Sequence, residues 1–185
     1  GTNEWVINGS KLWITNSACE LTKGVTVQAV TGKKSNGKAE LSCFIVPAGT
    51  KGMTQKAMHE KMMWRASNTG ELYFDDVRVP AKNMLGNKGD GFKQMMETLD
   101  NGRLSIAAMG LGLAKGALDL TIKYANERVT FGKPIAKHQA VAFKLAEMAT
   151  RTEAAENLLY KACWLKQENR PFQKEAAMAK LYCSE

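Results

Sequence analysis

The sequence predicts an α+β protein in which an antiparallel β-sheet or barrel domain is followed by a helical-bundle domain. Up to residue 80, short β-type segments are separated by glycine, proline and asparagine, as in antiparallel sheets. From residue 92 onward, apolar residues recur at spacings of three and four, as in amphipathic helices. The composition, 44% hydrophobic and 24% charged among 185 residues, is that of an ordinary globular protein. We therefore expect two domains, residues 1–88 and residues 89–185, the second of them truncated.

The β-type half begins with two short apolar segments, residues 5–7 and 12–14, on either side of Asn8 and Gly9. Asn-Gly between such segments is a strong short-range signal for a β-hairpin, so we expect a turn there. Further strands are expected in three segments that end at turn residues or proline: residues 25–30, 41–46 and 71–79.

The helical half begins with a long helix, because the apolar residues between positions 92 and 124 lie along one helical face. Four glycines lie within this helix: Gly102, Gly110, Gly112 and Gly116. Each lowers helix propensity by roughly 1 kcal/mol relative to alanine. Their clustering therefore indicates a close approach by a neighbouring helix or a ligand.

Two further helices are expected. The second runs from about residue 134 to residue 159, after a break at residues 132–134. Pro171 suits the first turn of a third helix. That helix shows no stop signal before Glu185, so we expect the chain to be cut inside it.

The net charge of +8 is dispersed along the chain, which is typical of a solvated surface and does not indicate a nucleic-acid-binding module. The four cysteines form no C-x-x-C pair, and with only two histidines a metal site has little support. Free thiols in a reducing compartment are expected instead. No uninterrupted apolar run approaches the roughly 20 residues of a membrane span, so none is expected.

Several segments resemble the acyl-CoA dehydrogenase family, in the family order and over essentially the whole chain. They are residues 5–16, 74–80, 99–103 and 124–134, the last followed by His138 and Gln139. The resemblance is to the middle β-domain and the start of the C-terminal helical domain of short- and medium-chain members. It implies an FAD-dependent oxidoreductase of fatty acid metabolism that removes hydrogen from the α,β bond of acyl-CoA thioesters.

The resemblance implies that the segment around Trp13, Ile14 and Thr15 contacts the flavin. Trp13 would pack on the isoalloxazine ring and Thr15 would hydrogen-bond its reactive edge. On a strand, Trp13 and Thr15 point to one side and Ile14 to the other. From the spacing alone, Trp13 could equally be a core residue of a half-buried strand.

By the same resemblance, Arg128, Phe131 and Gln139 contact an FAD held mainly by a neighbouring subunit, which implies a homodimer or homotetramer. A guanidinium offers a planar fork of donors that suits the pyrophosphate of FAD. The alternative for Arg128 is a surface ion pair with Glu127 or another nearby carboxylate.

The resemblance also assigns Asp100, Asn101, Gly102 and Arg103 to the acyl-CoA binding groove. Asp100 and Arg103 are three residues apart on one helical face and can pair with each other. A purely structural role for this pair is the alternative.

The catalytic base is not expected within this chain. The reaction needs a carboxylate that removes the α-proton while hydride passes to the flavin. In most of the family this is a glutamate that would lie beyond Glu185. In the isovaleryl- and long-chain branches it lies at the position of Gly102, and glycine cannot be a base.

The implied partners are the acyl-CoA substrate and the electron-transferring flavoprotein, in the bacterial cytoplasm or the mitochondrial matrix. Because one scaffold can host several chemistries, a flavin monooxygenase or a nitroalkane oxidase is an alternative. A folded module without catalytic activity is a further alternative for the chain alone.

Overall fold

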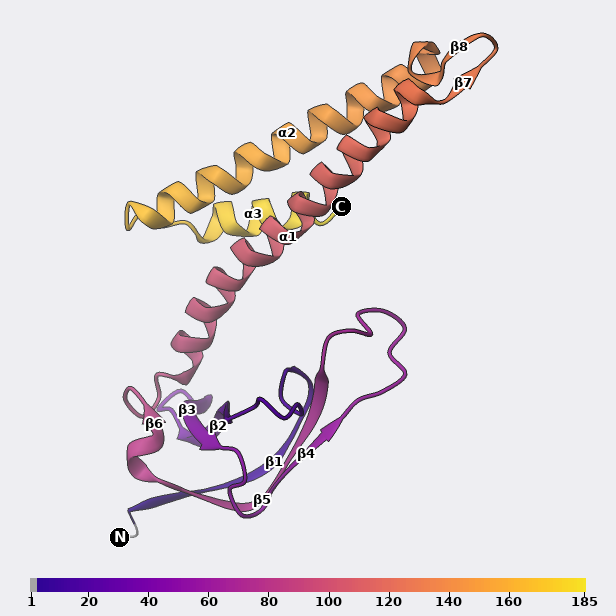
Figure 1. Ribbon diagram of the computed structural model, residues 1–185. Helices are drawn as coiled ribbons and strands as arrows, with labels where there is room; N and C mark the ends of the chain where they lie inside the picture. The colour runs from indigo at the N-terminus through magenta and orange to yellow at the C-terminus, as the bar shows by residue number, and fades with distance from the viewer. Residues whose placement is uncertain (1–2) are drawn as a thin grey trace. The chain divides into compact units, whose positions relative to one another are not determined.

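The computed structural model describes residues 3–185, and the chain divides into two compact units, Gly1–Met95 and Met96–Glu185 (Figure 1). The first is built from strands and the second from helices. This order confirms the predicted fold class. The expected domain boundary after residue 88 stays a prediction.

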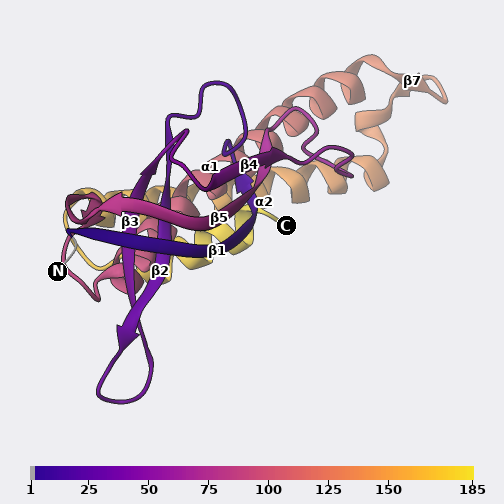
Figure 2. The ribbon, with the colours of Figure 1, turned by 90° about the horizontal axis from the view of Figure 1, so that it is seen from below.

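The first unit contains two three-stranded antiparallel sheets, ordered β1-β5-β4 and β2-β3-β6. The strands are β1 Glu4–Thr15, β2 Gly24–Lys33, β3 Ala39–Pro47, β4 Met53–Ala57, β5 Thr69–Pro80 and β6 Met84–Leu85, with a short 3-10 helix η1 at Ala81–Asn83. The long strands of the two sheets run in crossed directions (Figure 2). Within residues 3–185 the sheets do not close into a barrel.

The core of the sheet unit forms from apolar side chains of both sheets, because alternate residues of each strand face inward. Its buried members are Ile7, Val27, Phe44, Val46, Leu72, Phe74, Val77 and Val79. Trp5 lies at the margin of this core, with its ring centroid 5.3 Å from that of Phe44.

The hairpin predicted at Asn8 and Gly9 is wrong, because β1 continues through both residues. Asn8 faces two residues of β5, Asp75 and Asp76, so the pair of strands carries a β-bulge. The Asn8 side chain donates to Asp76 Oδ1 at 3.0 Å and accepts from the Asp76 backbone N–H at 2.7 Å. Pairing with a strand more than 60 residues away therefore outweighs the local turn preference of Asn-Gly.

The second unit is built on α1 (Gly91–Glu127), α2 (Gln139–Gln167) and α3 (Gln173–Cys183). The long first helix is confirmed. The second helix starts later than predicted, because a hairpin of β7 (Val129–Thr130) and β8 (Lys133–Pro134) precedes it, followed by a 3-10 turn η2 at Ile135–Lys137. Pro171 precedes α3, whose N-cap is Phe172, so its predicted place in the first turn is wrong.

The core of the helical unit consists largely of small residues, which let helices approach closely. Its buried members are Leu104, Ala107, Leu111, Ala155, Leu159, Ala162, Ala176, Ala179 and Cys183. A Cβ at Gly110 would lie 2.3 Å from the carbonyl oxygen of Cys183, which confirms a close helix approach at this glycine. At Gly102, Gly112 and Gly116 nothing in the described residues lies within 4 Å of the corresponding position, so no helix of this chain approaches there, and the approach of a ligand stays a prediction.

By length and composition α1 could also cross a membrane, although no membrane span is expected from the sequence. An 18-residue stretch of it has a mean hydropathy of 1.3, and 11% of that stretch is buried. A single helix of this kind is weak evidence for a membrane span, because core helices of soluble proteins can have the same composition. Lys115 on this helix pairs with Glu156 of α2 at 2.7 Å.

Candidate functional site

Trp13 occupies an irregular point of β1 and presents its ring to the surface. Leu12 and Trp13 together face Glu71 of β5, so β1 has a bulge there. Trp13 has a φ of +57°, a conformation that costs a residue with a side chain about 1–3 kcal/mol. Its side chain is 72% exposed, while Ile14 packs against the sheet core and Thr15 is exposed. Trp13 is therefore not a core residue, and the ring is available for a ligand.

Hydrogen bonds from residues that carry no sequence motif hold the end of β1 in place. The buried Ser17 donates to the carbonyl oxygen of Ile14 at 2.9 Å. Asn68 accepts from the Ala18 backbone N–H at 3.2 Å and donates to the Ala18 carbonyl at 3.3 Å. Gln55 donates to the carbonyl oxygen of Ser17. No sequence motif predicts these hydrogen bonds, because the residues that they join are up to 50 positions apart.

Asp100 and Arg103 form the local ion pair that their spacing allows. Arg103 donates to Asp100 Oδ1, and the side chains of Asp100 and Arg103 are 14% and 40% exposed. Asn101 donates to the carbonyl oxygen of Glu97 at 3.0 Å. The space beside Gly102 is open. The pair therefore orients a carboxylate and a guanidinium on one face of α1, and each retains hydrogen-bonding capacity for a ligand.

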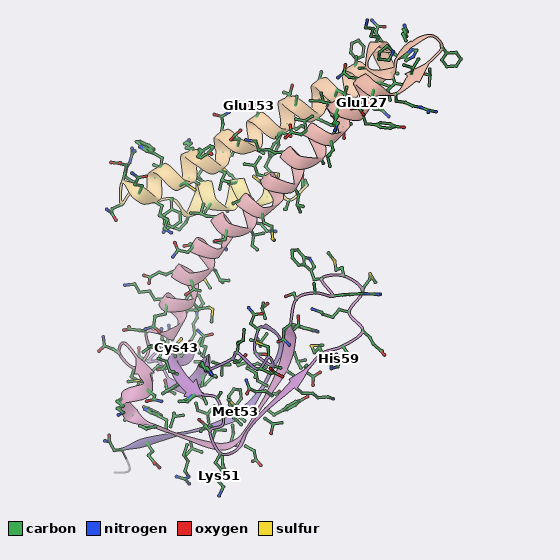
Figure 3. The ribbon with its side chains drawn as sticks, viewed as in Figure 1. Cys43, Lys51, Met53, His59, Glu127 and Glu153 are labelled. Carbon is green, nitrogen blue, oxygen red and sulfur yellow. The ribbon has the colours of Figure 1, made fainter. Side chains whose placement is uncertain are left out.

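The connection between α1 and α2 brings Arg128, Phe131 and Gln139 to one end of the helical unit. Arg128 follows α1, whose last residue, Glu127, is labelled in Figure 3, and Gln139 begins α2. Both are exposed, and among residues 3–185 Arg128 takes part in no ion pair. The alternative pair with Glu127 or another nearby carboxylate is therefore not formed among the described residues, and the guanidinium can bind an anion.

Phe131 stands at the turn of the β7–β8 hairpin. Phe131 and Gly132 have φ values of +49° and +76°, as a two-residue turn of type I′ requires. The Phe131 side chain is 96% exposed. Phe131 thus combines a strained backbone with an exposed aromatic ring that no core covers. Trp13 combines the same two features in the other unit.

The four cysteines are free thiols, as predicted. Burial raises the pKa of the Cys43 and Cys183 thiols above the usual 9.0. The hydrogen bond with Thr22 lowers the pKa of Cys19. Within the described part of the chain, no group of three or more histidine, cysteine, aspartate or glutamate side chains could hold a metal ion.

A cavity of about 280 Å³ lies within the helical unit. Apolar side chains of all three helices line it, among them Leu111, Met148 and Tyr182, with Arg151 and Glu185 as its charged members. The sequence pattern does not predict this cavity, because a cavity depends on how helices pack. Its walls suit an apolar group.

Antiparallel sheets followed by a helical unit place the chain in the structural class of the butyryl-CoA dehydrogenase of Megasphaera elsdenii. That solved structure matches with a TM-score of 0.90 and 45% identity, over 99% of this chain and 47% of that chain. The chain belongs to the acyl-CoA dehydrogenase family. The family model of the acyl-CoA dehydrogenase C-terminal domain matches residues 89–185, and that of the middle domain matches residues 1–77.

Relatives with this similarity include bacterial and mitochondrial proteins. A probable acyl-CoA dehydrogenase of Bacillus subtilis, YngJ, is 52% identical over 99% of this chain and 48% of its own length. The mitochondrial short-chain specific acyl-CoA dehydrogenase of Rattus norvegicus is 45% identical over 99% of this chain and 44% of its own length. The chain thus spans about half the length of these relatives.

Proposed function

We propose that this chain is part of an FAD-dependent acyl-CoA dehydrogenase of the short- or medium-chain type. Such an enzyme oxidises the α,β bond of an acyl-CoA thioester. The relatives named for short-chain and butyryl substrates support this substrate class. The structural observation that carries the proposal is the pair of exposed aromatic rings, Trp13 and Phe131, each held in a strained left-handed backbone.

The residues around Trp13 fit a flavin. When bound, FAD supplies a ring that accepts hydride. The exposed indole of Trp13 offers a flat apolar surface for such a ring, and the exposed hydroxyl of Thr15 offers a donor for its edge. Ile14 anchors the segment through its contact with the sheet core, so we assign its flavin contact to the backbone.

The α1–α2 connection supplies a second set of contacts, to an FAD held mainly by a neighbouring subunit. Arg128 would bind the pyrophosphate, because its guanidinium is exposed and enters no ion pair within the described residues. Phe131 would cover apolar parts of the cofactor, and Gln139 would hydrogen-bond it. Under this proposal, cofactor binding and assembly into a dimer or tetramer are linked.

Asp100, Asn101, Gly102 and Arg103 are proposed to line the acyl-CoA groove. The Asp100–Arg103 pair would orient the bound thioester, and the open space at Gly102 would admit it. No carboxylate of this chain is assigned as the base. We propose that the α-proton is taken by a glutamate of the protein beyond residue 185.

The proposed electron acceptor of the reduced enzyme is the electron-transferring flavoprotein. The location that suits the relatives is the bacterial cytoplasm or the mitochondrial matrix. Homologous activities on the same scaffold, such as those of a monooxygenase or a nitroalkane oxidase, would be excluded by turnover of an acyl-CoA with this partner.

The test is a visible absorbance titration of the purified chain with FAD, followed by anaerobic addition of butyryl-CoA. Trp13→Ala and Arg128→Gln are expected to weaken FAD binding about tenfold, as for the loss of one stacking or charged contact. Matched controls are Trp164→Ala and Arg151→Gln, at exposed positions of α2 outside the proposed site.

Flavin binding without bleaching by butyryl-CoA is the expected result. Bleaching would show that a carboxylate within the chain acts as base, contrary to the proposed mechanism. Absence of FAD binding, or equal losses in the site and control variants, would contradict the flavin site proposed here.

A further inference from the structure

His138 lies where the β7–β8 hairpin meets the start of α2. It is the N-cap residue of α2, and its carbonyl oxygen accepts from the backbone N–H groups of Val141 and Ala142, both at 2.9 Å. Its own N–H donates to the carbonyl oxygen of Ile135 at 3.0 Å. The backbone of His138 is therefore used by the helix start, while its side chain forms no capping hydrogen bond.

The imidazole of His138 instead reaches back to the hairpin. Its Nε2 lies 3.2 Å from Thr130 Oγ1 and 3.3 Å from the carbonyl oxygen of Thr130. A carbonyl oxygen only accepts, so the bond to it requires the proton on Nε2. The ring also meets Phe131 edge to face, with the centroids 6.1 Å apart and the planes at 85°.

These contacts connect His138 with each residue of the second proposed flavin set. Phe131 touches its ring, and Gln139 follows it in the chain. Arg128 is linked through Ile135, whose N–H donates to the Arg128 carbonyl oxygen at 2.8 Å. A short exposed hairpin has little core of its own, so the contacts of this side chain with Thr130 and Phe131 add support to it.

We propose that His138 is a positioning residue. It holds the hairpin so that Arg128, Phe131 and Gln139 can contact one flavin together. The hydrogen bonds from Nε2 to Thr130 hold the hairpin in position, and the ring contact with Phe131 stabilises it further. This inference rests on the proposed flavin function of the hairpin. Its structural part, the bracing of the hairpin by Nε2, can be measured without any flavin.

The first measurement is amide hydrogen exchange at Ile135, read by NMR in the absence of FAD. His138→Ala should speed this exchange about tenfold, since it removes the hydrogen bonds that close the hairpin. His138→Gln should restore slow exchange, because its amide nitrogen replaces Nε2. His138→Phe keeps a ring beside Phe131 but no donor, and should exchange as fast as the alanine variant.

The second measurement is FAD affinity from quenching of flavin fluorescence, with thermal unfolding by circular dichroism alongside. Wild type and His138→Gln are expected to bind FAD with similar affinity, and His138→Ala and His138→Phe are expected to bind it about tenfold more weakly. The midpoint of thermal unfolding should change little in any of these variants. The matched control is His59→Ala, which removes the other histidine of the chain, an exposed residue of the sheet unit.

Two results would overturn the inference. One is unchanged Ile135 exchange in His138→Ala. The other is a rescue of both readouts by phenylalanine and not by glutamine, which would assign the role to ring packing. If wild-type protein binds no FAD, the flavin function fails, while the exchange data still decide whether Nε2 braces the hairpin.

Discussion

At the scale of single residues, Phe131 shows a conflict between local stability and exposure. Its backbone is in the left-handed region and its ring is 96% exposed, so neither the conformation nor burial favours phenylalanine there. The following residue is Gly132, which suits the turn. A residue that neither the local conformation nor burial favours indicates a role outside the folded chain itself.

Phe131→Asn is therefore expected to stabilise the helical unit by about 1 kcal/mol, because Asn-Gly is the preferred pair for a type I′ turn. The same variant should weaken FAD binding through loss of the ring. Urea unfolding followed by circular dichroism gives the first quantity, and a flavin titration gives the second. A less stable variant would show that the backbone at this turn is not strained.

At the scale of elements, the glycines of α1 differ in what surrounds them. Gly110 lies against the end of α3, where its missing side chain lets the carbonyl of Cys183 approach. Gly112 lies two residues further along the same helix with open space beside it. The same residue type thus has a packing role at one position and none within this chain at the other.

Alanine at these two positions is expected to have opposite effects. Gly112→Ala should raise the free energy of unfolding by about 0.5–1 kcal/mol through helix propensity. Gly110→Ala should lower it by about 1–3 kcal/mol, because the new Cβ would lie 2.3 Å from the Cys183 carbonyl oxygen. Chemical denaturation of both variants checks this pair, and similar values for the two would refute the close approach.

At the scale of the whole molecule, each unit has its own core. Leu72 belongs to the core of the sheet unit, and Leu159 belongs to the core of the helical unit. The two leucines are 2% and 6% exposed, so they are matched in type and burial. Because the cores are separate, a substitution that destabilises one core should lower the stability mainly of its own unit.

Leu72→Ala and Leu159→Ala are each expected to cost about 2–5 kcal/mol within their own unit. Hydrogen exchange measured by mass spectrometry should show lost protection in residues 3–95 for the first variant and in residues 96–185 for the second. The double variant should show the sum of both effects. Loss of protection throughout the chain in either single variant would instead mean that the units unfold together.

Strong periodic patterns allowed α1 and the strands β2, β3 and β5 to be predicted from the sequence. In each of these elements, apolar side chains recur with the helical or the strand period over many residues. The local conformational preference and the burial of one face therefore favour the same element. The short β4 and β6 were not predicted, because short strands carry too little pattern and depend on their neighbours for pairing.

The family, the fold class and the candidate residues Trp13, Arg128 and Phe131 could be read from the order of residue types along the chain. What these residues present to a ligand was decided by the tertiary structure. The bulge opposite Glu71 exposes Trp13, and the bonds from His138 to Thr130 hold the hairpin that carries Phe131. The physical reason is that backbone strain and exposure depend on contacts between distant segments, which local sequence preference does not contain.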